Sequence, residues 1–277
     1  MKRIVTIQDI SCVGKCSLTV ALPIISAAGI ETAVIPTAVL STHTAFKGFT
    51  FADLTEQIEP ISRHWKQEKI NFDAIYTGYL GSFEQLEIVS RFIDSYRVGD
   101  CLAVIDPVMG DNGKLYAGFD RAFAYKMAEL CKKADIILPN LTEAAYMLGM
   151  EDIPQAATVD EVQAMLLKLC ERGTKVAIMT GVQKDGRLGA MGYDSRSGEF
   201  FSSFLEHINV SFHGTGDVFA SSFTAALVRG CDLQQATEVA VNYTVRAIIA
   251  TVNDPDARWY GVNFEQALPY LIERLNK

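Results

Sequence analysis

Short apolar segments along the chain alternate with longer helical patterns. The short segments are rich in Ile and Val and mostly lack strict alternation, which is typical of strands buried on both faces. They are Arg3–Ile7, Ala33–Thr37, Ala74–Thr77, Leu102–Ile105, Ile136–Leu138 and Val176–Thr180. The longer patterns predict helices at Cys16–Ala28, Phe51–Glu68, Phe83–Tyr96, Arg121–Lys132 and Asp160–Arg172. Strands and helices in turn predict right-handed βαβ units and a parallel sheet flanked by helices.

The pattern changes after Thr180. Leu188–Tyr193 and Glu199–Phe204 surround a polar turn and predict a hairpin, so we expect the sheet to end in antiparallel strands. Helices are predicted afterwards at Asp217–Arg229, Leu233–Ala250 and Phe264–Leu275. Because no linker or repeat interrupts the chain, the sequence predicts one α/β domain over residues 1–277. We expect a three-layer αβα sandwich whose mostly parallel central sheet has antiparallel strands near one edge.

Composition narrows the class of protein. Of the 277 residues 49% are hydrophobic and 21% are charged, which is ordinary for a globular protein. The net charge of −8 repels phosphate backbones, so we expect no nucleic-acid partner. The most apolar long stretch, Ala236–Val252, contains Glu238 and Arg246, so no membrane segment is expected. No cleavable leader is evident and the six cysteines are scattered, which predicts a cytoplasmic protein with reduced thiols.

Polar residues follow several of the predicted strands. In open α/β sheets, ligands bind beyond the carboxyl ends of the strands. The polar segments at those ends are Asp9-Ile10-Ser11, Thr77-Gly78-Tyr79, Asp106-Pro107, Pro139-Asn140 and Thr180-Gly181. The sequence therefore predicts a polar site along one edge of the sheet.

The segment Gly214-Thr215-Gly216-Asp217 opens a predicted helix with small residues. Free N–H groups at a helix start attract an anion, and glycine lets that anion approach the backbone closely. Because a carboxylate repels phosphate, Asp217 is better suited to take a proton from an attacking hydroxyl. The alternative is that Asp217 only satisfies backbone donors at the helix start.

Two further segments combine carboxylates with loop residues. Asp106 and Asp111 lie five residues apart in a glycine-containing loop, and their oxygens could hold Mg²⁺ directly or through water. The alternative for Asp111 is ordinary turn chemistry. Asn140 and Glu143 have the spacing of a capping box, which is as good an interpretation as a role in a metal site. Walker A, dinucleotide-binding, zinc and hydrolase-elbow motifs are absent.

Together these segments resemble the ribokinase-like superfamily and, within it, the pyridoxal kinases. Gly214-Thr215-Gly216-Asp217 looks like the anion hole and catalytic aspartate of the superfamily. The narrower match rests on Ser41-Thr42-His43-Thr44, Thr77-Gly78-Tyr79-Leu80-Gly81-Ser82, Asp106-Pro107-Val108-Met109-Gly110-Asp111 and Pro139-Asn140-x-x-Glu143. The resemblance covers most of the chain, from Gln8 to about Phe223.

The resemblance implies ATP-dependent phosphorylation of the 5′-hydroxymethyl group of vitamin B6, with Asp217 as general base. It implies that the loop Gly110–Phe119 is a flap over the phosphates, and that the protein is a homodimer. The implied vitamin-binding residues are Ser11, Thr44 and Tyr79. The implied ATP-binding residues are Asp111, Tyr116, Asn140, Glu143, Thr180 and Thr215, and the implied Mg²⁺ carboxylates are Asp106, Asp111 and Glu143.

Two positions depart from the family pattern. Leu138 stands where several members have a threonine near a monovalent-cation site, so K⁺ dependence stays open. Thr42 replaces the asparagine before His43, which leaves the choice among pyridoxal, pyridoxamine and pyridoxine open. The nearest alternative is a hydroxymethylpyrimidine kinase of the same superfamily. An alternative of another class is a non-catalytic sensor that binds vitamin B6 or a nucleotide.

Overall fold

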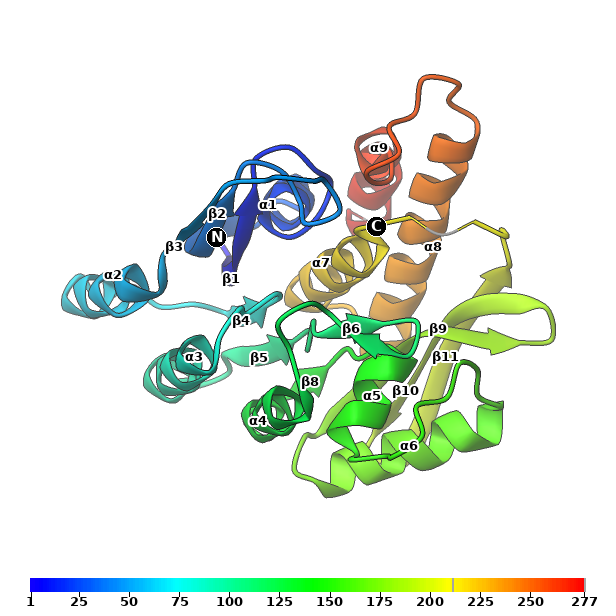
Figure 1. Cartoon of the computed structure of the whole chain (residues 1–277), viewed down its shortest axis with the longest axis horizontal. Helices are drawn as coiled ribbons and strands as arrows, with labels where there is room; N and C mark the ends of the chain where they lie inside the picture. The colour runs from blue at the N-terminus through cyan, green and yellow to red at the C-terminus, as the bar shows by residue number, and fades with distance from the viewer. Residues whose placement is uncertain (211, 277) are drawn as a thin grey trace. The chain divides into compact units, whose positions relative to one another are not determined.

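The computed structural model describes residues 1–210 and 212–276 of the chain. Their contacts divide the chain into two compact units (Figure 1). The first unit comprises Met1–Gly78 and Ile208–Lys277, and the second comprises Tyr79–His207. The prediction of a single domain stays a prediction.

The first unit contains strands in the order β4-β1-β2-β3. Their bounds are β1 Arg3–Ser11, β2 Glu31–Leu40, β3 Phe51–Asp53 and β4 Ala74–Thr77. β1 pairs in parallel with both β2 and β4, and β3 adds an antiparallel strand beside β2. The middle of β1 is buried, as expected for a strand with a neighbour on each side.

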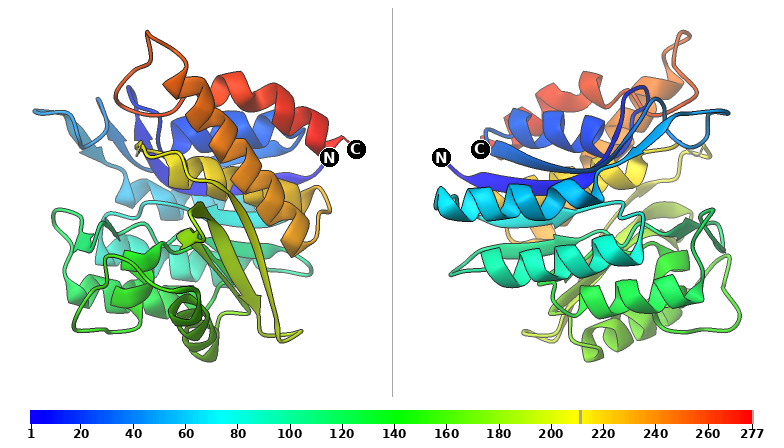
Figure 2. Two further views of the ribbon diagram at one scale, coloured as in Figure 1. Left: turned by 90° about the vertical axis from the view of Figure 1, so that its right-hand side faces the viewer. Right: turned by 60° about the vertical axis from the view of Figure 1, so that its left-hand side comes forward.

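Four of the five helices of the first unit pack against one another, whereas α2 packs against β2. The bounds are α1 Leu18–Ala27, α2 Thr55–Gln67, α7 Thr215–Val228, α8 Leu233–Val252 and α9 Phe264–Leu275. α7 packs against α1 and α8, and α9 lies beside α1 and α8 (Figure 2). Ser222 and Thr224 are fully buried in α7, where their hydroxyls donate to carbonyls of the preceding turn. Small buried residues therefore let neighbouring helices approach α7 closely.

The second unit contains a mixed set of strands in the order β11-β10-β9-β8-β5. Their bounds are β5 Leu102–Ile105, β8 Ile136–Ile137, β9 Val176–Lys184, β10 Arg187–Asp194 and β11 Glu199–Glu206. β5, β8 and β9 are parallel, whereas β10 and β11 are antiparallel. A separate small hairpin joins β6 Gly110–Asp111 to β7 Lys114–Leu115.

Side-chain caps fix where the helices of the second unit begin. These helices are α3 Phe83–Tyr96, α4 Arg121–Cys131, α5 Leu141–Met147 and α6 Val159–Glu171. The side chains of Ser82, Asp120, Asn140 and Thr158 each accept a hydrogen bond from the third residue of the following helix. None of the helices in the described parts of either unit has the length and apolar character needed to cross a lipid bilayer.

The long elements agree with the sequence-based prediction in order and type, while several bounds differ. α1 begins at Leu18, two residues later than predicted, and β2 covers Glu31–Leu40 and not only Ala33–Thr37.

Phe51–Asp53 is an edge strand and not the start of a helix, because it pairs antiparallel with β2. α2 begins only at Thr55, whose N–H donates to Asp53 Oδ1. α7 begins at Thr215, two residues earlier than predicted, because Gly214 takes the N-cap position. The short strands β3, β6 and β7 were not predicted, since two or three residues carry no periodic pattern.

Candidate active site

The first turn of α7 leaves backbone N–H groups open for an anion. Gly214, the N-cap residue, has a φ of 79° and makes no side-chain cap. A Cβ at this position would lie 1.9 Å from the Lys15 carbonyl oxygen, so only glycine fits. A Cβ at Gly216 would meet nothing within 4 Å. One side of the helix start is therefore free for a ligand, while the other side is closed by the chain.

Asp217 lies in this first turn and is not a cap. Burial raises the pKa of its carboxyl to about 7, and the nearby charge of Asp9 adds to the increase. The main-chain N–H of Ser17 acts in the opposite direction by stabilising the ionised form. A carboxylate with a pKa near neutrality is suited to accept a proton from a substrate hydroxyl.

The raised pKa of Asp217 makes stability depend on pH. Because the pKa rises from 3.8 to about 7 on folding, the folded protein binds more protons than the unfolded chain between these values. The free energy of unfolding therefore falls as the pH increases through this window, and the penalty is complete above about pH 7. We expect Asp217→Asn to be more stable than wild type at pH 8, on the order of 2–4 kcal/mol.

Chemical denaturation of both proteins at pH 5 and pH 8 measures this effect. The variant should show a smaller loss of stability between the two pH values. Burial also raises the pKa of Glu143, so part of the pH dependence should remain. Equal pH dependence in the two proteins would mean that the Asp217 carboxylate is not desolvated in the folded state.

The two residues of the first unit that are predicted to bind the vitamin differ in their exposure to solvent. Ser11 is buried at the end of β1 and donates to Asp9 Oδ2 at 3.2 Å. Thr44 is exposed in the loop after β2. His43 is buried, and its Nδ1 accepts the Ala45 N–H at 3.1 Å. The His43 ring also packs against His213, with 5.2 Å between ring centroids. Thus the loop that carries Thr44 contacts the residue before the glycine-rich turn.

In the second unit, Asn140 and Glu143 form the expected capping box at the start of α5. Glu143 Oε1 also accepts the Met109 N–H, at 3.1 Å. The Asn140 side-chain amide donates to the Gly110 carbonyl, at 2.8 Å. The two side chains therefore tie the helix start to the loop that begins the β6–β7 hairpin, which is the predicted flap.

The three predicted Mg²⁺ carboxylates have different surroundings. Asp106 is buried, and Asp111 is exposed with both oxygens hydrogen-bonded to Asn112. Both Glu143 oxygens accept main-chain N–H groups, yet burial still raises its pKa. Across residues 1–210 and 212–276, no group of three or more His, Cys, Asp or Glu residues could hold a metal ion. These hard oxygen donors fit Mg²⁺ only if water and phosphate oxygens complete the coordination.

The remaining predicted residues also belong to the second unit. Tyr79 packs near Phe119, with 5.6 Å between ring centroids. Tyr116 is 42% exposed, and its N–H donates to the Met109 carbonyl. Thr180 forms a parallel bridge with Asn140 and lines a cavity of about 50 Å³ with Gly181 and Gln155, among others. Leu138 is buried and offers no side-chain oxygen to a cation.

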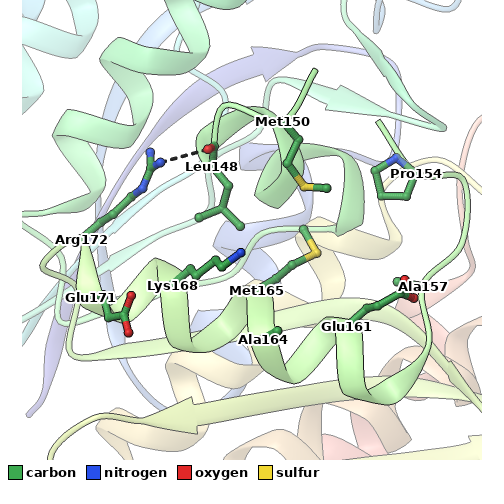
Figure 3. A pocket seen from close by; sticks show the side chains of 10 residues that line it. All are labelled: Leu148, Met150, Pro154, Ala157, Glu161, Ala164, Met165, Lys168, Glu171 and Arg172. Atoms are coloured by element: carbon green, nitrogen blue, oxygen red, sulfur yellow. Dashed lines mark hydrogen bonds between the residues drawn. The ribbon is translucent and has the colours of Figure 1, made fainter. Parts of the chain in front are cut away.

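The larger cavity of the second unit holds none of the predicted site residues. It has a volume of about 560 Å³ (Figure 3). Its lining includes the apolar Leu148, Met150 and Met165 and the charged Lys168 and Arg172. The Arg172 guanidinium is held by the Leu148 carbonyl, at 2.9 Å.

Sequence reasoning missed Asp9 and Ser17 as groups that act on Asp217. In the sequence, Asp9 is only one of the polar residues that follow the first predicted strand. Ser17 carries no motif, and its signal is a backbone φ of 50° that only the structure reveals. Both residues belong to the first unit, as Asp217 does, and both influence the pKa of its carboxyl.

An α/β fold with a glycine-opened helix start and a buried carboxylate in its first turn fits a kinase-type phosphotransferase of the ribokinase-like class. The family model described as phosphomethylpyrimidine kinase matches residues 25–257. A pyridoxal kinase of Pasteurella multocida is 30% identical, over 99% of this chain and 96% of its own. The chain therefore belongs to the kinase family that this model describes and that includes pyridoxal kinases, as its motifs indicated.

Two other similarities bear on fold and substrate class. A Bacteroides thetaiotaomicron protein described as a phosphomethylpyrimidine kinase, in a crystal form with pyridoxal, is 38% identical. Its TM-score is 0.92, with 98% of this chain and 95% of the other covered, which confirms the three-layer, mostly parallel fold. A hydroxymethylpyrimidine/phosphomethylpyrimidine kinase of Bacillus subtilis is 29% identical, over 73% of this chain and 71% of its own.

Proposed function

We propose that this kinase transfers the γ-phosphoryl group of ATP to the 5′-hydroxymethyl group of a B6 vitamer. The observation that carries the proposal is the carboxylate of Asp217, with a pKa near 7, in the first turn of α7. Relatives named as pyridoxal kinases and a similar protein solved with pyridoxal support vitamin B6 as the substrate class. The hydroxymethylpyrimidine alternative is supported by the family model and the Bacillus subtilis relative.

In the proposed reaction, Asp217 accepts the proton of the 5′-hydroxyl group. The freed oxygen forms a bond to the γ-phosphorus, and the bond from that phosphorus to the bridging oxygen breaks, so ADP leaves. The N–H groups of Gly214–Asp217 are proposed to stabilise charge on the transferred phosphoryl oxygens. Ser11, Thr44 and Tyr79 are proposed to bind the vitamin ring, and Tyr79 offers an aromatic surface for a flat heterocycle.

The proposed nucleotide residues are Asp111, Tyr116, Asn140, Glu143, Thr180 and Thr215. Asp106, Asp111 and Glu143 would hold Mg²⁺, in part through water, and when bound the cation neutralises charge on the phosphates. Glu143 and Asn140 would also fix the start of the flap through their contacts with Met109 and Gly110. K⁺ dependence stays open, since the Leu138 side chain offers no oxygen to a cation where several family members have a threonine.

The flap should limit hydrolysis of ATP by water. We expect that shortening the turn at Asp111–Lys114 increases the ratio of ATP hydrolysis to B6 phosphorylation, because water then reaches the γ-phosphate. Comparing the rates of ADP and 5′-phosphate formation in one assay measures this ratio. Shortening the turn after β9, at Asp185–Gly186, provides a matched control that should leave the ratio unchanged. An equal ratio in the flap variant and wild type would remove this role from the loop.

A sensor and an enzyme differ in turnover. We expect ADP and pyridoxal 5′-phosphate to form in equal amounts, with many turnovers per protein molecule, when Mg²⁺, ATP and pyridoxal are present. A sensor would bind these molecules without forming ADP. Binding with no product would therefore overturn the catalytic proposal and favour the sensor.

The proposal also covers the oligomeric state of the protein and its location in the cell. We propose a homodimer, on the family resemblance, which light scattering after size exclusion would test. A cytoplasmic location is supported by the free thiols of Cys12, Cys16, Cys101, Cys131, Cys170 and Cys231.

A further inference from the structure

The β6–β7 hairpin, which is the proposed flap, is too short to hold its position by itself. It has two residues in each strand and forms a separate two-stranded sheet. Its connecting residues, Asn112 and Gly113, have φ values of 50° and 76°, and two positive φ values are typical of a tight hairpin turn. Contacts with the rest of the second unit must therefore fix the hairpin, which lies beside α5 (Figure 1).

Side chains at the start of α5 hold both ends of this hairpin. At its base, Asn140 and Glu143 form hydrogen bonds to the main chain where β6 begins. At its tip, the Gly113 N–H donates to the Thr142 hydroxyl oxygen at 2.8 Å. Thr142 is 4% exposed and lies between Asn140 and Glu143 in the sequence. One turn of helix therefore fixes the base and the tip of the flap.

The segment between α5 and α6 supplies a second contact to the tip. A Cβ on Gly113 would lie 1.9 Å from Gln155 Nε2, so the Gln155 carboxamide occupies the space that a side chain would need there. The φ of 76° at Gly113 also favours glycine. The tip is therefore held by a hydrogen bond to Thr142 and by packing against Gln155.

The tip in turn holds the carboxylate of Asp111. Asp111 Oδ1 accepts the Asn112 N–H at 2.8 Å, and Oδ2 accepts the Asn112 side-chain amide at 3.0 Å. Because both carboxylate oxygens are bonded to the turn, the position of the carboxylate follows that of the turn. The bond between Gly113 and α5 therefore fixes Asp111 relative to Asn140 and Glu143, two other residues proposed for ATP.

We propose that Thr142 is a positioning residue for ATP: its hydroxyl, with Gln155 against the same turn, holds the flap and its Asp111 at the start of α5. Without this hydrogen bond the tip moves more freely, so ATP with Mg²⁺ is bound less tightly. The Thr142 hydroxyl faces the flap, so binding of the vitamin should change little. This inference rests on the proposed role of the flap in ATP-dependent phosphorylation.

Thr142→Val and Thr142→Ser separate the hydroxyl from the rest of the side chain. Valine has nearly the same shape but cannot accept the Gly113 N–H, whereas serine can. We expect Thr142→Val to raise KM for ATP about fivefold, with kcat and KM for pyridoxal changed less than about twofold. Thr142→Ser should stay within about twofold of wild type. Equal increases in the two KM values, or equal effects of valine and serine, would overturn the inference.

Thr237→Val is the matched control, because it removes a buried hydroxyl that bonds a carbonyl within its own helix, α8. It should keep the wild-type KM for ATP. A fivefold increase in this control as well would mean that loss of any buried hydroxyl has the same effect, and it would overturn the specific role of Thr142.

Hydrogen–deuterium exchange followed by mass spectrometry measures the flap without turnover. In Thr142→Val, residues 109–117 should exchange about three- to tenfold faster than in wild type, while Thr142→Ser should exchange at the wild-type rate. Gln155 is exposed, so Gln155→Ala folds even if Thr142→Val does not, and it should exchange at least about twofold faster. Wild-type exchange in Gln155→Ala, or in a folded Thr142→Val protein, overturns the inference.

Calorimetric titration with ATP and Mg²⁺ keeps the two proposals apart. The Kd for ATP should be about fivefold higher in Thr142→Val than in wild type. Faster exchange of the flap with an unchanged Kd overturns the positioning role, even if wild type phosphorylates pyridoxal. Faster exchange with weaker ATP binding, in a protein that phosphorylates no B6 vitamer, supports the role of Thr142 and overturns the proposed function.

Discussion

Replacing Asp217 with asparagine should lower kcat for pyridoxal phosphorylation by about 10²–10⁴-fold, the contribution that a positioned base makes. The amide has the same shape as the carboxylate but cannot accept the proton of the 5′-hydroxyl group. The variant should still bind pyridoxal and ATP, because the ring contacts and the N–H groups of the α7 start remain. Steady-state kinetics together with calorimetric binding of pyridoxal would separate these two effects.

Asp185→Asn is the matched control, since Asp185 lies at an exposed turn between β9 and β10. It should retain wild-type kcat and binding. If Asp217→Asn gains stability at pH 8 as expected, its loss of activity does not come from unfolding. Near-normal turnover in a folded Asp217→Asn protein would remove this residue from the mechanism.

Gly214→Ala should have the second-largest effect, and it should act on both stability and turnover. The new Cβ would lie 1.9 Å from the Lys15 carbonyl oxygen, in a residue whose φ is 79°. Because backbone cannot move aside as a flexible side chain does, we expect a loss of about 2–4 kcal/mol in the free energy of unfolding. The start of α7 should shift, and kcat should fall with it.

Gly216→Ala is the comparison variant, because it adds the same methyl group to the same turn on the side that no other atom contacts. A Cβ at Gly216 meets nothing within 4 Å, and alanine favours a helix more than glycine does. Stability should therefore stay equal or rise by about 1 kcal/mol. Equal stability of Gly214→Ala and wild type in urea denaturation would contradict the geometry of this turn.

The order and type of the long elements were predictable from the sequence. α3 and β4 have the bounds that the apolar pattern predicted. α3 shows a clear helical period of apolar residues, and β4 is a short segment that is buried throughout. β1 extends four residues past its prediction, to Ser11. Its polar end is held in the strand by pairing with β2, which no local pattern reveals.

The parts of the candidate site that depend on hydrogen bonds between residues close in the sequence were predictable. The capping box of Asn140 and Glu143 follows from spacing alone and is confirmed. The second contact of Glu143, with the N–H of Met109, was not predictable because it joins segments 34 residues apart. The same reason hid Asp9, whose effect on Asp217 depends on how β1 and α7 pack.

The most direct measurement is ATP- and Mg²⁺-dependent phosphorylation of pyridoxal, pyridoxamine, pyridoxine and hydroxymethylpyrimidine, side by side under the same conditions. We expect kcat/KM for at least one B6 vitamer to exceed that for hydroxymethylpyrimidine. A preference for the pyrimidine would contradict the assignment of Ser11, Thr44 and Tyr79 to a B6 ring, while it would leave the fold and the role of Asp217 in place. Turnover of none of the four would contradict the proposed function itself.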